Sequence, residues 1–302
     1  MQPAKLTVMM DWPSLLAEIE ATTGLAVSHT TALKTVHGGD IHQAYHLHMP
    51  DGDYFLKLNQ ASALPLFQAE ADSLNAIEQS QTLACPKPLG FGCSTATEHA
   101  WLLMTYLPLS THGEDFQRGQ AIAMLHHTLN PEQRFGWHQD NFIGHTPQYN
   151  DWHTDWIHFY GEQRLKPQLE LAKQKGAPSQ LFTLGEQLMA CLPKFFTHYT
   201  PSPSLLHGDL WSGNSAFLTH GEPVIFDPAC YYGDRETDLA MTELFGGFSP
   251  AFYEGYHQVF PIDDGYPQRR PLYQLYHLLN HYNLFGGHYA QQCLRMMQTL
   301  IA

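Results

Sequence analysis

The spacing of apolar and polar residues divides the chain into a part rich in predicted strands and a longer part rich in predicted helices. In the first part, helices are predicted over residues 11–23 and 64–79, where apolar residues recur at helical spacing. The strands predicted there, separated by turn residues in several places, cover residues 27–36, 42–49, 54–58, 89–91 and 101–107. This part is therefore predicted to form a β-sheet with accompanying helices.

After Pro108 the pattern becomes mainly helical. The helices predicted in this part cover residues 114–129, 152–175, 178–196, 235–245, 250–260, 268–284 and 289–301. Strands and loops are predicted to interrupt them over residues 204–232. We therefore predict an α+β fold with a β-rich N-lobe over residues 1–107, a mainly helical C-lobe over residues 108–302, and a cleft between the two.

Charge and cysteine content narrow the classes of protein. The formal net charge is -14, with 15 lysines and arginines in 302 residues, so neither a nucleic-acid nor a membrane partner is expected. The five cysteines are scattered without CxxC spacing, which favours reduced thiols over disulfides or a zinc site. The start of the chain lacks the pattern of a signal peptide, and no apolar run approaches the ~18 residues of a membrane helix. We expect a cytoplasmic protein.

Twenty histidines make a metal site one interpretation to test. His277 and His281 lie four residues apart on a predicted helix, a spacing that zinc ligands use. No HExxH pattern is present, and the flanking Tyr276 and Leu278 have the character of packing residues. We therefore favour structural or pocket-lining roles for these histidines.

Three polar residues in the C-terminal half have a spacing that points to phosphoryl transfer. Asn214 follows Asp209 by five residues, and Asp227 follows Asn214 by thirteen. In a kinase, the first aspartate of this pattern accepts the proton of the attacking hydroxyl, and the asparagine and second aspartate hold the Mg²⁺ ions that bridge the ATP phosphates. An Asx-turn role for Asp209 alone is the alternative, and it leaves the matched spacing unexplained. We interpret the chain as an ATP- and Mg²⁺-dependent kinase with a protein-kinase-like fold.

Lys57 is the candidate phosphate-binding lysine. It lies in the predicted strand over residues 54–58, and burying a lysine without an anionic partner is costly. Glu70 is the expected ion-pair partner, because it lies thirteen residues further on, in the predicted helix. The alternative is a solvated lysine on an edge strand. The presence of the catalytic-loop pattern in the same chain favours the phosphate-binding role.

Three other segments fit a nucleotide site. Gly38 and Gly39 lie between two predicted strands, where backbone amides can bind phosphate, although any hairpin could use two glycines. The residues predicted to form the hinge, whose backbone would bind the adenine edge, are Met104, Thr105, Tyr106 and Leu107. Asp238 is expected to brace the catalytic loop through backbone hydrogen bonds.

Two features of the sequence favour a small-molecule kinase over a protein kinase. Position 208 is Gly, where a eukaryotic protein kinase carries the arginine that binds a phosphorylated activation loop. Asp227 is followed by Pro-Ala and not by Phe-Gly. Regulation by an activation loop is therefore not expected.

The sequence resembles the fructosamine kinase (ketosamine 3-kinase) family over essentially its full length. The matching segments are GGDIHQAY (38–45), FLK (55–57), GWHQDNFIG (136–144), HGDLWSGN (207–214), YGDRETDLAM (232–241) and LFGGF (244–248). The HGDxxxxN pattern is shared with aminoglycoside and choline kinases. The tryptophan at 211 and the segments 136–144 and 232–248 are more specific to the family.

The resemblance implies ATP-dependent phosphorylation of the C3 hydroxyl of a ketosamine, free or protein-bound, which then breaks down and frees the amine. Ribulosamines and erythrulosamines are expected to be preferred over fructosamines. By position, Asp209 would be the base, Asn214 and Asp227 the metal ligands, and Lys57 the phosphate-binding lysine. Asn141, Trp211 and Tyr232 are the candidates for the substrate pocket, because their loops flank Asp209. Some family members carry a cysteine in the glycine-rich turn that supports a redox-linked dimer. Residues 37–46 contain none, so we expect no such redox switch. We expect a monomer or weak dimer.

Two alternatives remain open at this point. One is another small-molecule kinase, acting on aminoglycosides, choline or homoserine, and the acidic net charge is compatible with an aminoglycoside. The other is a nucleotide-binding pseudokinase that serves as a scaffold. The presence of Lys57, Asp209, Asn214 and Asp227 together argues against the second alternative.

Overall fold

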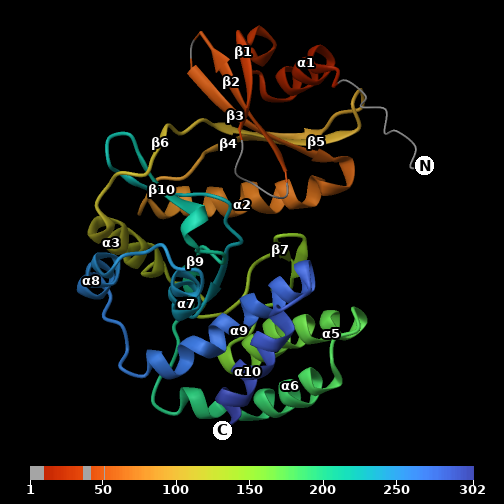
Figure 1. Cartoon of the computed structure of the whole chain (residues 1–302). Helices are drawn as coiled ribbons and strands as arrows, with labels where there is room; N and C mark the ends of the chain where they lie inside the picture. The colour runs from red at the N-terminus through yellow and green to blue at the C-terminus, as the bar shows by residue number, and fades with distance from the viewer. Residues whose placement is uncertain (1–9, 37–41, 51) are drawn as a thin grey trace. The chain divides into compact units, whose positions relative to one another are not determined.

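The computed structural model describes residues 10–36, 42–50 and 52–302, and its contacts divide the chain into two compact units (Figure 1). The first unit contains the described residues up to Ala71 together with Pro86–Leu107. The second contains Asp72–Cys85 and Pro108–Ala302. Helix α2 (Leu64–Ser80) contributes residues to both units, so residues 72–85 join the unit that follows residue 107 in sequence.

The first unit contains, within the described ranges, a five-stranded sheet with the order β1-β2-β3-β5-β4 and antiparallel neighbours throughout. The strands are β1 (Ala32–Val36), β2 (Gln43–Met49), β3 (Gly52–Gln60), β4 (Pro88–Cys93) and β5 (His99–Thr105). The sheet confirms the strand-rich character predicted for this part of the chain.

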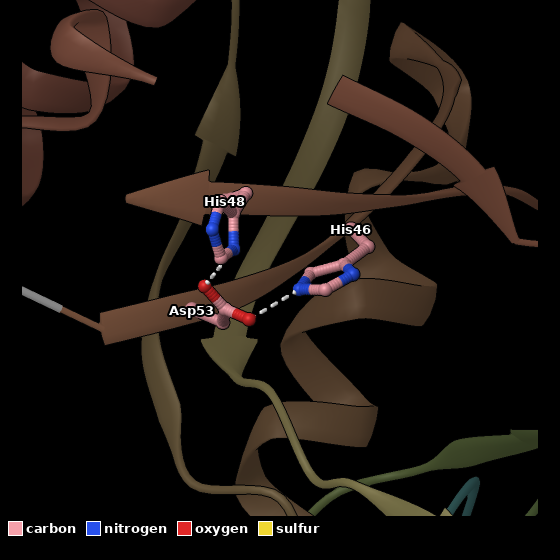
Figure 2. Close-up of side chains that lie close together, drawn as sticks. All are labelled: His46, His48 and Asp53. Carbon is pink, nitrogen blue, oxygen red and sulfur yellow. Dashed lines mark hydrogen bonds and ion pairs between the residues drawn. The ribbon is translucent and has the colours of Figure 1, made fainter. Parts of the chain in front are cut away.

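The two faces of this sheet differ because side chains alternate along each strand. One face carries Leu47, Leu56 and Leu103, which pack in one cluster with Leu15 and Ile19 of helix α1 (Trp12–Thr23). Helix α1 begins where predicted, because the Asp11 carboxylate accepts a hydrogen bond from the backbone N–H of Ser14, and it ends at Gly24 in the left-handed conformation. The alternate positions form the opposite face, which carries Lys57. His46, His48 and Asp53 lie on this face as well (Figure 2).

One predicted strand was too long. The sequence predicts a strand over residues 27–36, whereas the structure has a 3-10 turn over Val27–His29 and begins β1 only at Ala32. Val27 is fully buried, and the Ser28 backbone N–H and hydroxyl both donate to the Glu20 carboxylate. These local contacts satisfy the backbone N–H groups of residues 27–30 without a neighbouring strand.

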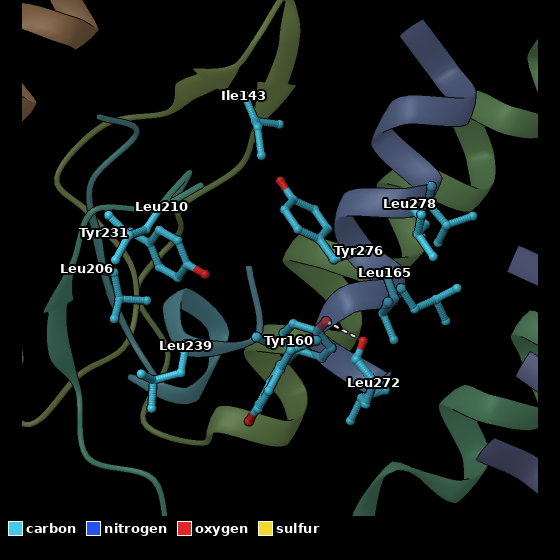
Figure 3. Packing of buried hydrophobic residues seen from close by; sticks show 14 of the residues in the cluster. Ile143, Tyr160, Leu165, Leu206, Leu210, Tyr231, Leu239, Leu272, Tyr276 and Leu278 are labelled. Carbon is cyan, nitrogen blue, oxygen red and sulfur yellow. Dashed lines mark hydrogen bonds between the residues drawn. The ribbon is translucent and has the colours of Figure 1, made fainter. Parts of the chain in front are cut away.

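The second unit is mainly helical, as predicted. Its helices are α3 (Asp115–His126), α4 (Trp156–Phe159), α5 (Lys166–Gln174), α6 (Ser179–Cys191), α7 (Glu236–Leu244), α8 (Pro250–Val259), α9 (Tyr266–Phe285) and α10 (Tyr289–Ile301). A π-helical segment, Tyr160–Leu165, joins α4 to α5. Apolar residues from these helices and from the loops between them form one large core (Figure 3). In that core the Tyr160 hydroxyl donates to the Leu272 carbonyl oxygen at 3.0 Å.

Short antiparallel strands lie within and on either side of residues 207–227 in the second unit. Strand β10 (Ser215–Leu218) lies between β11 (Pro223–Ile225) and β6 (Leu109–Ser110). Strand β9 (Ser204–Leu206) pairs with β12 (Tyr231–Gly233). The structure also contains a hairpin of β7 (Asn141–Ile143) and β8 (Thr146–Gln148), which the apolar pattern did not predict.

A network of buried charges holds α7 against α9. Arg269 donates to both carboxylate oxygens of Glu236, at 2.7 and 2.9 Å, and Glu236 is fully buried. The Asp234 carboxylate accepts hydrogen bonds from the hydroxyls of Tyr199 at 2.9 Å and Tyr273 at 2.5 Å. Because buried charges without partners are costly, every member of this network depends on the others.

Within residues 10–36, 42–50 and 52–302, no helix is long and apolar enough to cross a membrane.

Candidate active site

Asp209 and Asn214 are joined directly by hydrogen bonds. The loop leaves strand β9 after Leu206 and ends in a 3-10 turn over Ser212–Asn214. The Asn214 side-chain amide donates to the Asp209 main-chain oxygen at 2.9 Å, and a longer hydrogen bond of 3.4 Å reaches Asp209 Oδ2. Because the Asn214 nitrogen is directed to Asp209, its side-chain oxygen is the atom left to accept a hydrogen bond or bind a cation.

The β10–β11 hairpin explains why Asn214 and Asp227 come together despite their separation in sequence. Asn214 immediately precedes β10, and Asp227 follows β11 by two residues. The strands pair with Ser215 opposite Ile225, and the Phe226 N–H donates to the Asn214 carbonyl oxygen at 3.1 Å. Asp227 itself has φ +57, a left-handed conformation that aspartate and asparagine tolerate better than most residues. The spacing of thirteen residues is therefore the length of this hairpin.

The electrostatics of Asp209 suit a site that binds a cation. Burial raises the pKa of Asp209 to about 7, and the negative charges of Asp227 and Asp238 act in the same direction. The hydrogen bond from Asn214 opposes them. Carboxylate and amide oxygens are the donors that Mg²⁺ prefers, and Asp227 is exposed, so the donor set fits this ion. A cation there would offset the repulsion between the carboxylates.

His207 links the loop that carries Asp209 to the segment that carries Asp227. Its Nδ1 accepts a hydrogen bond from the Asp209 N–H at 3.2 Å, and its Nε2 lies 3.0 Å from the Phe226 carbonyl oxygen. These contacts fit a neutral ring protonated at Nε2. Burial lowers the pKa of His207, which agrees with the neutral form. His207 therefore fixes the two halves of the site to each other.

Asp238 braces the loop, as the sequence predicted. Its carboxylate accepts hydrogen bonds from the backbone N–H groups of His207 at 2.7 Å and Gly208 at 2.9 Å. His126 Nε2 lies 3.1 Å from the same carboxylate. Burial alone would raise the pKa of Asp238, but the His126 hydrogen bond and the nearby histidines outweigh it, and the pKa lies below its ordinary value. His126 was not predicted, because it lies 112 residues from Asp238.

The first unit holds the candidate nucleotide residues that are described. Lys57 on β3 is 6% exposed, and its Nζ lies 2.5 Å from Glu70 Oε1 on α2. This is the ion pair expected from the sequence. Gly38 and Gly39 lie outside the described residues. The four candidate hinge residues occupy the end of β5 and the two positions after it, namely Met104, Thr105, Tyr106 and Leu107.

Backbone hydrogen bonds fix the hinge candidates within the first unit. The Thr105 N–H donates to the Lys87 carbonyl oxygen at 2.9 Å, and the Tyr106 N–H donates to the Asp53 carbonyl oxygen at 3.3 Å. Met104 is 2% exposed and belongs to the sheet itself. The Tyr106 ring stacks on His46, with 3.8 Å between ring centroids.

The candidate substrate residues lie in three different environments. Trp211, beside Asp209, is 39% exposed. Asn141 is 2% exposed, donates to the Cys230 carbonyl oxygen at 2.7 Å and accepts from Gln148 at 2.8 Å. The Asn141 amide thus holds β7 to the segment that follows Asp227, and it does not face solvent.

Tyr232 is partly buried and lies in an aromatic pocket. Its ring centroid is 5.4 Å from that of Trp137 and 6.4 Å from that of Trp152. The cavity has a volume of about 420 Å³ and is also lined by Asp72, whose carboxylate accepts a hydrogen bond from Trp137 Nε1 at 2.7 Å. The sequence did not predict this pocket, because its residues come from segments that lie far apart in the sequence.

Comparisons with known proteins place these features in a family. The family model for fructosamine kinase matches residues 11–302. The probable ketoamine kinase of Synechocystis sp. is 45% identical, with 96% of this chain and 97% of that protein covered. The chloroplastic protein-ribulosamine 3-kinase of Arabidopsis thaliana is 39% identical, with 90% of this chain and 83% of that protein covered.

Solved structures show the same fold. A crystal structure of a protein assigned as a fructosamine-3-kinase, from Haemophilus somnus 129PT, has a TM-score of 0.84 and 28% identity, covering 96% of this chain and 98% of that one. The choline kinase LicA from Streptococcus pneumoniae, at 11% identity, has a TM-score of 0.63 and covers 94% of this chain and 98% of its own. The fold is therefore the predicted protein-kinase-like fold.

Proposed function

The chain belongs to the fructosamine kinase family, and from this premise we propose that it transfers the γ-phosphoryl group of ATP to the C3 hydroxyl of a ketosamine. The observation that carries the proposal is the hydrogen-bonded arrangement of Asp209, Asn214 and the Asp227 segment in a chain so similar to ketoamine kinases. The product adduct would then break down and free the amine. Within this class we propose ribulosamines and erythrulosamines as better acceptors than fructosamines.

In the proposed reaction Asp209 orients the acceptor hydroxyl and takes its proton late, because phosphoryl transfer depends mainly on positioning and charge balance. Asn214 and Asp227 would hold Mg²⁺, which supplies positive charge beside the transferred phosphoryl group. Asn214 also fixes the Asp209 backbone through its amide. His207 and Asp238 are proposed as positioning residues, since their side chains form hydrogen bonds with the backbone of the loop that carries Asp209.

Lys57 is proposed to contact the α- and β-phosphates, with Glu70 holding its ammonium group in place. Gly38 and Gly39 are proposed to cover the phosphates, and Met104–Leu107 to bind the adenine. For the acceptor, the exposed Trp211 ring is the proposed contact for the sugar. We propose that Tyr232 contributes from its aromatic pocket, and that Asn141 acts indirectly by holding the Cys230 segment.

The test is an assay for Mg²⁺- and ATP-dependent phosphorylation of a ribulosamine, with an erythrulosamine, a fructosamine and kanamycin in parallel. We expect turnover of the ketosamines, phosphate at C3 and subsequent release of the amine. Asp209→Asn should abolish turnover, whereas Asp264→Asn, which changes an exposed aspartate on the surface, should not. Turnover of kanamycin alone would reject the ketosamine assignment and leave the kinase chemistry intact. Full activity in Asp209→Asn would reject the proposed role of that residue.

We also propose that the enzyme works in the cytoplasm as a monomer or weak dimer. The five cysteines, Cys85, Cys93, Cys191, Cys230 and Cys293, are all free thiols, which fits a reducing compartment. Cell fractionation would test the location. Size-exclusion chromatography with light scattering, with and without reductant, would test the assembly.

A further inference from the structure

Two histidines and an aspartate lie together at the end of the β2–β3 hairpin (Figure 2). His46 Nε2 lies 2.8 Å from Asp53 Oδ2, and His48 Nδ1 lies 2.7 Å from Asp53 Oδ1. One ligand atom from each of the three residues lies within 4.8 Å of the others. None of the roles proposed above for nucleotide or acceptor uses these three side chains.

Strand geometry builds this cluster. His46 and His48 are two residues apart on β2, so their side chains point to the same face of the sheet. Asp53 lies directly opposite His48 in the register of β2 and β3. Residues opposed in this way have Cβ atoms only about 4.5–5.5 Å apart. Strand pairing therefore fixes the backbone positions from which the three side chains meet.

The surroundings hold one side of the cluster and leave the other open. Tyr106 stacks on the His46 ring with an angle of 5° between the planes, and its N–H donates to the Asp53 carbonyl oxygen. The His46 side chain is 17% exposed and the Asp53 side chain 27%. The His48 side chain is 58% exposed, which gives an ion a path from solvent.

We propose that His46, His48 and Asp53 bind a Zn²⁺ ion, with the remaining coordination position open to water. Two imidazole nitrogens and a carboxylate are donors that zinc uses, whereas Mg²⁺ and Ca²⁺ prefer oxygen ligands alone. With neutral imidazoles the site carries one negative charge, which attracts the cation. Lys34 of β1 is paired with His46 of β2, and its positive charge would repel the cation. Its side chain is exposed and can extend into water, away from the ion.

Binding of the ion requires the three side chains to adjust. Zinc–nitrogen and zinc–oxygen bonds of about 2.0–2.1 Å place tetrahedral ligand atoms about 3.3 Å apart. The two histidines now contact different oxygens of Asp53, at 2.8 and 2.7 Å. An ion that takes one of these oxygens therefore requires one contact to widen and the other ligand atoms, which lie within 4.8 Å of one another, to draw together. Rotation of the exposed His48 ring can supply much of this change.

The alternative is a cluster of ion pairs between protonated histidines and Asp53. The two arrangements respond oppositely to protons. Zinc needs deprotonated imidazoles, so its binding weakens as the pH falls, whereas the ion pairs form only when the imidazoles become protonated. Zinc affinity measured at several pH values therefore separates them.

The experiment is a titration of the chelator-treated full-length protein with Zn²⁺ at pH 7.5 against a chromophoric competitor. We expect one site per chain with a micromolar or tighter dissociation constant, lost in both His48→Gln and Asp53→Asn. The matched control is His220→Gln, because His220 is an exposed histidine whose Nε2 also lies next to a carboxylate, at 2.9 Å from Glu222. Circular dichroism and thermal unfolding without metal should show that all three variants are folded.

X-ray absorption provides an independent measurement on the zinc-loaded protein. We expect a first shell of nitrogen and oxygen at about 2.0–2.1 Å with no sulfur at about 2.3 Å. A sulfur shell would assign the ion to cysteines and overturn the proposal. An unchanged number of bound ions in both His48→Gln and Asp53→Asn would overturn it as well, and so would affinity that rises as the pH falls.

A consequence for nucleotide binding rests on the proposed function. An ion on His46 and Asp53 would fix the two groups that contact Tyr106, one of the candidate hinge residues. The dissociation constant of a non-hydrolysable ATP analogue should therefore fall several-fold with zinc in the wild type and stay constant in His48→Gln. An unchanged constant in the zinc-loaded wild type would overturn this coupling. Zinc binding is measured without nucleotide, so failure of the proposed kinase activity would not affect that result.

Discussion

The carbonyl oxygen of Ala229 occupies the space beside Gly208, so a β-carbon at position 208 would lie only 2.0 Å from it. Gly208 also has φ +84, a conformation that disfavours other residues. The loop that carries Asp209 and the segment that follows Asp227 thus pack backbone against backbone. This packing explains why an arginine cannot replace glycine here in the present structure.

Gly208→Ala should therefore reduce phosphoryl transfer by about 100-fold or more, because a displacement of about 1 Å at reacting groups has that cost. The matched control is Gly221→Ala. Gly221 has a similar φ of +92, but no atom lies within 4 Å of its added β-carbon. Initial rates and thermal unfolding should be measured for both variants. The comparison separates the effect of the clash with Ala229 from the cost of placing alanine at a positive φ. Equal activity in the two variants would contradict this explanation.

Asp227→Asn should abolish the response of the enzyme to Mg²⁺. Asparagine has nearly the same shape and tolerates the left-handed conformation at φ +57, so the fold should survive. The loss of a negatively charged oxygen ligand should weaken the binding of Mg²⁺. In wild type, chelation should stop turnover and added Mg²⁺ should restore it. Rates measured across a range of Mg²⁺ concentrations check the prediction, and a variant with a wild-type Mg²⁺ dependence would refute it.

Asp238→Asn should lower both stability and turnover. The carboxylate accepts hydrogen bonds from two backbone N–H groups, and an asparagine amide brings donors toward them. We expect a loss of about 2 kcal/mol in the free energy of unfolding, the scale of a hydrogen bond to a charged group. Glu243→Gln on the same helix is the control, because Glu243 contacts Tyr266 and Arg270 and not the loop. It should retain kcat, whereas Asp238→Asn should lose it.

His277 should make the protein less stable in mild acid. Burial lowers the pKa of His277 to about 3, and the residue is 3% exposed, as its expected packing role requires. Below the unfolded value of about 6.5, the unfolded chain binds a proton that the folded chain does not, so the free energy of unfolding falls as the pH falls. Between pH 7 and pH 5 this one group should cost about 2 kcal/mol.

Chemical denaturation at the two pH values checks this prediction when it is repeated on His277→Gln. The other titrating groups are shared by both proteins, so they cancel in the difference. The variant should lose about 2 kcal/mol less than the wild type over this range. An identical pH dependence would show that His277 is not the responsible group.

The residues that local patterns specify were predictable from the sequence. Asp209, Asn214 and Asp227 have a fixed spacing because a loop and one hairpin connect them. Helix α10 was predicted with its observed ends, since its apolar positions recur regularly and glycines precede it. Lys57 and Glu70 could be paired because a strand and the following helix set their separation.

Contacts between distant segments were not predictable in the same way. His126 reaches Asp238 across 112 residues, and no local pattern marks it. The β7–β8 hairpin is only three residues per strand, too short for alternation to show. Asn141 was placed near the substrate because of its neighbours in sequence, but its hydrogen bond with Cys230 depends on the tertiary fold.

The buried pair of Glu236 and Arg269 also has a consequence for how related sequences can diverge. The Glu236 carboxylate has Arg269 as its ion-pair partner in the interior, so loss of Arg269 alone leaves a buried charge behind, whereas loss of Glu236 leaves Arg269 with Asp263 alone. A sequence that replaces both residues one mutation at a time would have to pass through this destabilised single mutant. Across homologues these two sites should therefore vary as a pair or hardly at all, and the double exchange should be tolerated better than either single one.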